Sequence, residues 1–229
     1  MSVRRVLLFD IDGTLVWGGP AKDAFEYAMM ETYGTTGDVE GTSFAGKTDP
    51  QIARELLTGV GYEPTRIDEG LERLFHLYTT RLEALLPERP VTVLPGVPEL
   101  LETLGALDRV GMALLTGNVV RGAQLKLGNA GLFDHFALGS YGSDAEHREE
   151  LPGIALERAQ NTWGDALKAD DAIVVGDTPR DIACARAGGM RVVAVATGSY
   201  TPDQLAAEGA DHVFEDFRDL SEVVSVLAD

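Results

Sequence analysis

The chain has 229 residues, 45% of them hydrophobic, and no apolar run approaches the roughly 20 residues that a membrane-spanning helix needs. With 37 acidic residues against 19 Lys and Arg, the net charge of −18 argues against binding to nucleic acid or to anionic membranes. The single cysteine, Cys184, excludes an internal disulfide, and no signal-peptide pattern precedes Asp10, so we expect a cytoplasmic protein.

Short apolar, β-branched runs predict five buried strands in chain order. They cover residues 3–9, 110–115, 172–175, 191–195 and 212–214, with a small edge element at 136–138. Helical spacing of apolar residues alternates with the strands over 97–107, 119–130, 153–163, 180–187, 203–207 and 220–227. This alternation predicts an α/β fold, a Rossmann-like three-layer core whose parallel sheet carries helices on both faces. Right-handed crossovers would then place every strand C-terminus at one edge, where ligands bind.

Residues 16–93 break the alternation, because they contain one helical pattern after another. The predicted helices cover 21–33, 50–57 and 66–86, and glycine-rich stretches separate them. We therefore expect a helical cap domain at 16–93, inserted after the first strand of a core made of 1–15 and 94–229. Such an insert would lie above the strand-end edge.

Polar residues follow three of the predicted strands. Asp10 and Asp12 come after the first, Thr116-Gly117-Asn118 ends the second, and Asp177 and Asp181 come after the third. Four carboxylates brought together in a low dielectric would repel one another strongly. A bound divalent cation would relieve this repulsion, and hard oxygen ligands favour Mg²⁺.

The order Asp-x-Asp-Gly-Thr, a strand ending in Thr, then Gly-Asp-x-x-x-Asp resembles the haloacid dehalogenase superfamily of phosphatases. The helical insert is similar to the subgroup with an α-helical cap, which contains phosphoglycolate phosphatase-like enzymes. The resemblance spans nearly the whole chain and depends on the order and spacing of the motifs. It implies a Mg²⁺-dependent phosphohydrolase that cleaves a small phosphate monoester. Phosphoglycolate-like or sugar-phosphate substrates follow from the resemblance alone, because fold does not settle function.

The resemblance also implies a role for each motif residue. Asp10 would attack phosphorus and form an aspartyl-phosphate. Asp12 would protonate the leaving group and then activate water. Thr116 would bind a phosphate oxygen with the backbone N–H of Gly117, and Asn118 belongs to the same substrate-binding turn. The implied metal ligands are Asp10, Asp12 through its backbone carbonyl, Asp177 directly, and Asp181, which would ligate through water or orient the ligand shell.

One departure from the family pattern concerns its lysine, which usually precedes the helix leading into the third motif. Here that stretch, residues 146–153, contains no lysine, and its arginine is Arg148. We assign Arg148 to hold the nucleophile and the phosphate, although a planar guanidinium changes the geometry. Lys126 is the weaker candidate, because its helix follows the second motif.

Residues 41–48 match the phosphate-binding P-loop pattern by letter, but that motif needs a buried strand before it. Residues 35–40 are polar, so we interpret 41–48 as a cap loop that leads to a helix capped at Thr48 or Asp49. Lys47 would either contact the substrate or be solvated, and the sequence leaves both open.

Three rival functions remain. A phosphomutase would share the first steps and return the phosphoryl group to a sugar. A true dehalogenase would have no use for Asp12, and a catalytically silent metal-binding interaction module would not need the full set of acids. The oligomeric state is left open.

Overall fold

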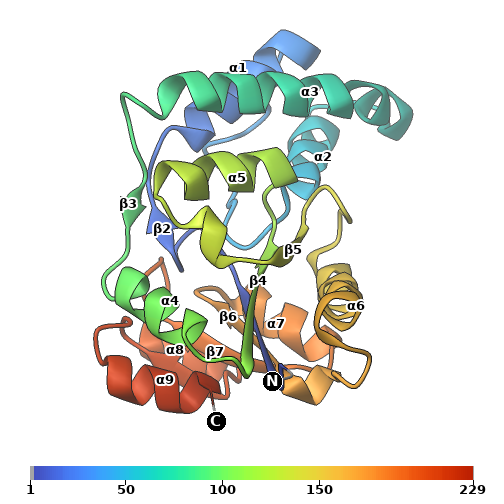
Figure 1. Ribbon diagram of the computed structural model, residues 1–229. Helices are drawn as coiled ribbons and strands as arrows, with labels where there is room; N and C mark the ends of the chain where they lie inside the picture. Colours follow the sequence, from blue (N-terminus) through green and yellow to red (C-terminus); the bar gives the residue numbers. More distant parts are fainter. Residues whose placement is uncertain (1–2, 229) are drawn as a thin grey trace.

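The structure is a computed structural model that describes residues 3–228. Within this range the main sheet has six strands in the order β5-β4-β1-β6-β7-β8, and every neighbouring pair is parallel. Figure 1 shows the sheet in the lower part of the molecule, with helices around it. The strands are β1 (Arg5–Phe9), β4 (Val110–Thr116), β5 (Leu138–Tyr141), β6 (Ala172–Gly176), β7 (Arg191–Val195) and β8 (His212–Phe214). The predicted parallel α/β sheet is confirmed.

Helices cover both faces of this sheet, because its strands are apolar on both sides. In β1, Leu7 and Phe9 join one apolar cluster, whereas Val6 and Leu8 join the other. The helices on the first face are α4 (Val97–Gly105), α5 (Val120–Asn129) and α9 (Leu220–Ala228). Those on the second are α6 (Leu151–Trp163), α7 (Pro179–Ala187) and α8 (Pro202–Ala207). The three-layer core is therefore as predicted.

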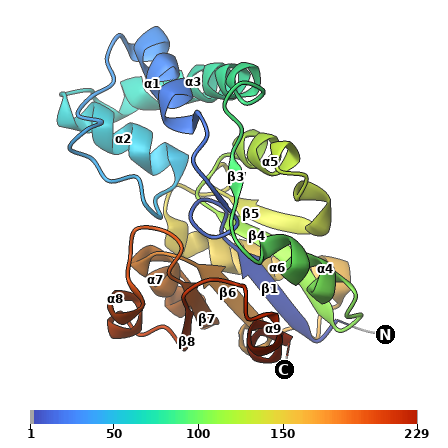
Figure 2. The same cartoon turned by 90° about the vertical axis from the view of Figure 1, so that its left-hand side faces the viewer.

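Three further helices form the helical insert: α1 (Ala21–Tyr33), α2 (Asp49–Gly59) and α3 (Pro64–Leu85). Figure 2 shows them grouped together on one side of the sheet, beyond the ends of its strands. Buried insert residues such as Met29 and Leu82 belong to the same apolar cluster as Phe9 of the sheet. The insert is thus packed continuously onto the core.

The chain enters and leaves the insert through two short strands, β2 (Val16–Trp17) and β3 (Thr92–Val93). They pair antiparallel, and the N–H of Leu94 donates to the carbonyl of Leu15 at 3.0 Å. Two-residue strands give no periodicity, so the sequence did not predict them. The division into 1–15 with 94–229 and 16–93 remains a proposal, and residues 1, 2 and 229 of it lie outside the described residues.

The edge strand predicted at 136–138 lies instead at Leu138–Tyr141. A 3₁₀ turn, η1 (Phe133–His135), precedes it, and Phe136 is buried edge-to-face against Phe9 with ring centroids 5.9 Å apart. The apolar residue Phe136 therefore belongs to the core contact with Phe9 and not to the strand. The strand that follows contains Gly and Ser, which have low strand propensity and conceal it in the sequence.

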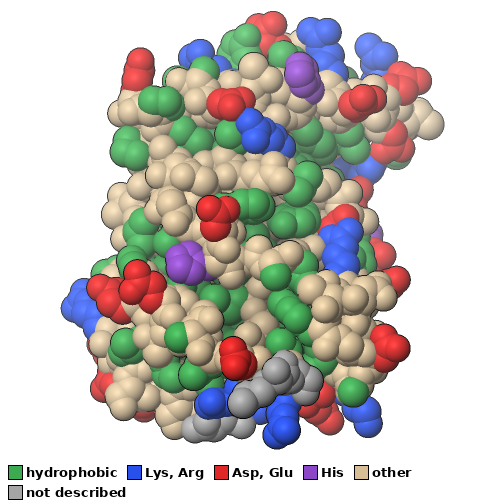
Figure 3. Space-filling model, in the orientation of Figure 1, with side chains coloured by type: hydrophobic (Ala, Val, Ile, Leu, Met, Phe, Trp, Pro, Cys, Tyr) green, Lys and Arg blue, Asp and Glu red, His purple; other side chains and the backbone are tan. Residues whose placement is uncertain are grey.

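Acidic side chains are scattered over both the sheet part and the insert part of the face in Figure 3. Among the described residues, no helix combines the length and the apolarity needed to cross a bilayer.

Two adjacent methionines of α1 allow a matched test of how the insert is packed. Met29 is fully buried, whereas Met30 is 51% exposed. We expect Met29→Ala to lower the free energy of unfolding by about 2–5 kcal/mol, because it leaves a cavity. Met30→Ala should change it by less than about 0.5 kcal/mol. Urea denaturation of the two variants would check this, and equal losses would contradict the packing described.

Candidate active site

The site forms where three neighbouring strands end. Strand β1 lies between β4 and β6, so Asp10, Thr116 and Asp177 come side by side at one edge of the sheet. The backbone N–H of Asp10 continues the pairing with β6 by donating to the carbonyl of Val175 at 2.9 Å. The parallel topology therefore brings the first motif beside two others that lie more than a hundred residues further along the chain.

Asp10, Asp177 and Asp181 form an acidic cluster, in which one carboxylate oxygen from each lies within 4.8 Å of the others. All three side chains are buried. The Arg148 guanidinium donates to Asp10 Oδ1 at 2.9 Å and also to Asp181 Oδ1. Three carboxylates against one guanidinium leave two negative charges without a partner in the cluster. This charge and these oxygen donors fit a hard divalent cation, so the cluster could hold a metal ion.

The electrostatics of the cluster reflect this excess of negative charge. Burial raises the pKa of Asp10 above its usual range, with Arg148 opposing the rise and Asp181 adding to it. Burial also raises the pKa of Asp177, and the carboxylates of Asp181 and Asp10 raise it further. The cluster therefore resists holding all of its charge without a further cation.

The start of α7 fixes Asp181 in the cluster. Thr178 is the N-cap and Asp181 the third helical residue, and the two side chains form a capping box. The backbone N–H and the hydroxyl of Thr178 donate to Asp181 Oδ2 at 3.0 and 2.7 Å, which leaves Oδ1 facing Arg148. Pro179 occupies the first turn, where its missing N–H costs nothing.

Gly13 allows the turn after Asp12 to approach Asp177. Its φ is 87°, and a Cβ at this position would overlap the Asp177 carboxylate. Thr14 donates from its hydroxyl to Asp177 Oδ1 at 3.3 Å. The Gly-Thr pair of the first motif thus supports an acid of the third.

The Asp12 side chain points away from the acidic cluster, toward α5. Lys126 Nζ lies 2.8 and 2.6 Å from its two carboxylate oxygens, and Asn118 Nδ2 donates to Oδ2 at 2.8 Å. Lys126 is the residue that sequence reasoning underrated. Its signal was a lysine on the buried face of a helix, beside Gly122, Ala123 and Leu127, in a chain with four lysines.

Thr116 and Gly117 lie at the end of β4, next to these groups. Thr116 Oγ1 accepts from Asn118 Nδ2 at 2.9 Å and from Asn118 N at 3.3 Å, so its own proton can be donated elsewhere. A Cβ on Gly117 would overlap the carbonyl of Lys47, because the insert passes directly over this turn. Asp49 N donates to the Gly117 carbonyl at 2.8 Å.

The loop before α2 brings the insert into the site. Thr48 caps α2 by accepting from Gln51 N, and its hydroxyl donates to the carbonyl of Glu146 at 2.5 Å. Arg148 Nη1 donates to the carbonyl of Gly46 at 3.2 Å. The Lys47 ammonium pairs with Glu55. No strand precedes this loop among the described residues after Trp17, in agreement with its interpretation as a cap loop.

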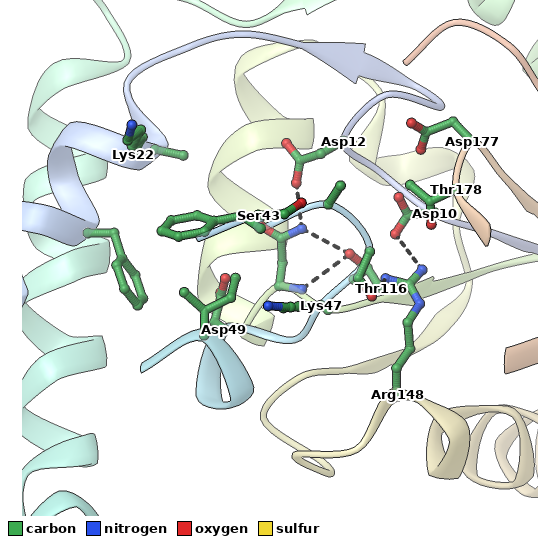
Figure 4. A pocket seen from close by; sticks show the side chains of 18 of the residues that line it. Asp10, Asp12, Lys22, Ser43, Lys47, Asp49, Thr116, Arg148, Asp177 and Thr178 are labelled. Atoms are coloured by element: carbon green, nitrogen blue, oxygen red, sulfur yellow. Dashed lines mark hydrogen bonds and ion pairs between the residues drawn. The ribbon is translucent and has the colours of Figure 1, made fainter. Parts of the chain in front are cut away.

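A cavity of about 430 Å³ lies between the strand ends and the insert. Figure 4 shows Asp10, Asp177 and Arg148 on one side of it and Lys22 on the other. All the predicted site residues except Asp181 line this cavity, since Asp181 is fully buried behind it. Three of the four lysines of the chain, Lys22, Lys47 and Lys126, also line it. A local group of cations therefore faces the cavity of a strongly acidic chain.

A family model described as haloacid dehalogenase-like hydrolase matches residues 4–189. The chain belongs to this family. The resemblance predicted from the three motifs is confirmed, and with it the expectation that this protein is an enzyme.

Related sequences extend over almost the whole of this haloacid dehalogenase-like hydrolase. It is 29% identical over 226 residues to phosphoglycolate phosphatase 1 of Pseudomonas aeruginosa, covering 94% of this chain and 78% of the relative. It is 28% identical to phosphoglycolate phosphatase of Rhodobacter capsulatus, covering 95% of each. The crystal structure of a predicted phosphatase from Clostridium acetobutylicum superposes with a TM-score of 0.74 at 16% identity, covering 99% of this chain and 100% of that one.

Asp49 is a further acid of the hydrolase's cavity, and the sequence had considered it only as a helix cap. Its Oδ2 accepts from the N–H of Val119, the first residue before α5, at 2.8 Å. Burial raises the pKa of Asp49 to about 6, although Lys126 and the hydrogen bond from Val119 oppose the rise. The carboxylate therefore costs stability when it is ionised in the folded state.

Because of this raised pKa, we expect Asp49→Asn to increase the stability of the folded state by an amount that depends on pH. Below about pH 4 the Asp49 carboxyl is neutral in both states. As pH rises from about 4 to about 6 the unfolded chain ionises first, so the folded wild type loses stability, and above pH 6 the loss is constant. The stability of the variant relative to wild type should rise by about 3 kcal/mol across this window, since each unit of pKa difference corresponds to about 1.4 kcal/mol. Thermal melts from pH 4 to pH 8 test this, and a pH-independent difference would contradict it.

Proposed function

We propose that this hydrolase is a Mg²⁺-dependent phosphatase that cleaves a small phosphate monoester through a phosphorylated Asp10. The observation that carries the proposal is the acidic cluster, in which Asp10, Asp177 and Asp181 meet Arg148 at one end of a cavity. Phosphoryl transfer depends mainly on positioning and on neutralisation of charge, which is what this arrangement supplies.

In the first step, a carboxylate oxygen of Asp10 forms a bond to phosphorus while the bond from phosphorus to the leaving-group oxygen breaks. Asp12 gives its proton to that oxygen, so the organic product leaves as an alcohol. Asp12 suits this role because it lies two residues beyond the nucleophile and its side chain is 46% exposed at the cavity. The product of the step is an aspartyl-phosphate on Asp10.

In the second step, water attacks the phosphorus of the aspartyl-phosphate and loses a proton to the Asp12 carboxylate. The bond from phosphorus to the Asp10 oxygen breaks, inorganic phosphate leaves, and both aspartates return to their starting forms. The same residue thus serves first as acid and then as base, as a two-step displacement requires.

The neighbouring groups hold the phosphate. Arg148 keeps the Asp10 carboxylate in place and offers positive charge to the phosphoryl oxygens. The free hydroxyl proton of Thr116 and the backbone N–H of Gly117 donate to the same oxygens. Asp10, Asp177, Asp181 and the carbonyl of Asp12 would hold Mg²⁺. When bound, Mg²⁺ supplies the positive charge that lets one anion approach another.

The organic part of the substrate would lie toward the insert, where Lys47 and Lys22 can attract a second anionic group. The two related phosphoglycolate phosphatases make phosphoglycolate the first substrate to test, followed by sugar phosphates. The insert would exclude water during transfer. A metabolite of this kind and a single buried cysteine, Cys184, support a cytoplasmic location, which we also propose.

A phosphomutase would use the same aspartyl-phosphate and return the phosphoryl group to a second hydroxyl of a sugar. Product analysis distinguishes the two, because a phosphatase releases inorganic phosphate in amounts equal to the alcohol. A silent metal-binding module would retain the acidic cluster but give no turnover with any ester.

Asp10→Asn should abolish turnover, because an amide cannot form the phosphorylated intermediate. The fold should persist, since the change removes one of three mutually repelling carboxylates. Hydrolysis of p-nitrophenyl phosphate with Mg²⁺, followed by a panel of phosphate esters, measures the effect. Asp165→Asn, at an exposed loop position, is the matched control and should keep full activity. More than a trace of turnover in Asp10→Asn rules out the mechanism.

Removal of the metal should abolish activity, and Mg²⁺ should restore it. Mg²⁺ should also raise the melting temperature of wild type, since an ion at 100 times its Kd adds about 2.7 kcal/mol to the stability of the folded state. Asp177→Asn should lose most of this shift and be about as stable as wild type without metal, because burial and the neighbouring carboxylates raise the pKa of Asp177 and already disfavour its charged form. A full Mg²⁺ shift in Asp177→Asn would place the ion elsewhere.

A further inference from the structure

Two buried cations contact acids of this site, and they have no acid in common. Arg148 contacts Asp10 and Asp181 of the acidic cluster, whereas Lys126 contacts Asp12. Lys126 Nζ lies 2.6 and 2.8 Å from the Asp12 oxygens and 2.7 Å from Asn118 Oδ1. An ammonium has three N–H groups, and these contacts account for all of them.

Asn118 provides the second contact that fixes Asp12. Its Nδ2 donates to Asp12 Oδ2 at 2.8 Å and to Thr116 Oγ1 at 2.9 Å, while its Oδ1 accepts from Lys126. The amide orientation is therefore determined on both sides. Two donors, one from α5 and one from the turn after β4, hold the Asp12 carboxylate in one direction.

The position of Lys126 makes little sense as a contribution to packing. Its side chain is only 5% exposed, and its helix face is otherwise made of the buried residues Gly122, Ala123 and Leu127. Taking an ammonium out of water is unfavourable, and a well-packed apolar residue would avoid that cost. The lysine is therefore explained by its contact with Asp12 rather than by the stability of the core.

The surroundings of Asp12 explain why a cationic partner matters for it. It lies two residues from Asp10, whose cluster already carries an excess of negative charge, and its own side chain is 46% exposed. Without a counter-charge on the side of α5, the Asp12 carboxylate would be repelled by the cluster and free to rotate into solvent. The contact with Lys126 opposes both effects.

We propose that Lys126 is a positioning residue that acts through Asp12. It holds the Asp12 carboxyl group where this group can pass a proton to the leaving-group oxygen and later take one from the attacking water. The inference rests on the proposed function, in which Asp12 is the acid and base. Protons move between Asp12, the leaving group and water, and Lys126 remains an ammonium throughout.

The test compares two esters that need an acid to different degrees. p-Nitrophenolate leaves readily without a proton, whereas phenolate leaves far less readily. For Lys126→Met we expect kcat/KM on phenyl phosphate to fall about 10- to 100-fold, with a much smaller loss on p-nitrophenyl phosphate. Asp12→Asn should give the same selective pattern, and the double variant should be no worse than Asp12→Asn, because both changes remove one function.

Lys168→Met is the matched control, since Lys168 is exposed and is the one lysine that does not line the cavity. It should match wild type with both esters. If Lys126→Met does not fold, as judged by circular dichroism, Lys126→Gln replaces it, because the shorter polar side chain keeps a donor without the charge. It should show the same selectivity with a smaller loss.

Three results would overturn the inference. An equal loss with both esters that appears in KM would mean that Lys126 binds the substrate. An unchanged kcat/KM would mean that Asp12 needs no partner, and additive losses in the double variant would separate the two residues. If the wild type hydrolysed neither ester with Mg²⁺, the proposed function itself would be wrong. That result is visible without any variant, so the two failures can be told apart.

Discussion

The repulsion among buried carboxylates at adjacent strand ends is the constraint on which the rest of this structure depends. Asp10, Asp177 and Asp181 are brought together by a sheet in which β1 lies between β4 and β6. Their charges exceed what Arg148 can neutralise. The features around the cluster offset this excess of negative charge, because they either hold an acid in place or bring in positive charge.

Local structure at the ends of a strand and a helix holds two of the acids in place. The capping box of α7 fixes Asp181 by contacts within four residues, and Gly13 lets the turn after β1 approach Asp177 without a side chain between them. These arrangements depend on local residue choices at strand and helix ends. A metal ion would then complete an arrangement that the protein has already prepared, as the raised pKa values of Asp10 and Asp177 indicate.

The helical insert contributes more than a cover. Its loop before α2 contacts the turn after β4 through Asp49, the segment before α6 through Thr48, and Arg148 through Gly46. These polar contacts join the insert to two separate parts of the core, the turn after β4 and the segment before α6 that contains Glu146 and Arg148. The cavity between them is lined by residues of both parts, so a small molecule held there would be enclosed by both.

The sequence by itself determined the alternating strands and helices, the helical insert and the acids at the strand ends, because each is encoded by neighbours within a few residues. Short elements such as β2 and β3 escaped prediction, since two residues carry no periodicity. The family resemblance had already assigned Arg148 to the nucleophile Asp10, but only the tertiary structure decided that Lys126 meets Asp12. Lys126 and Asp12 are 114 residues apart, and their contact depends on where α5 lies relative to the turn after β1. Long-range packing leaves no local pattern, so a pairing without a motif behind it, such as that of Lys126 with Asp12, could not be predicted from the sequence.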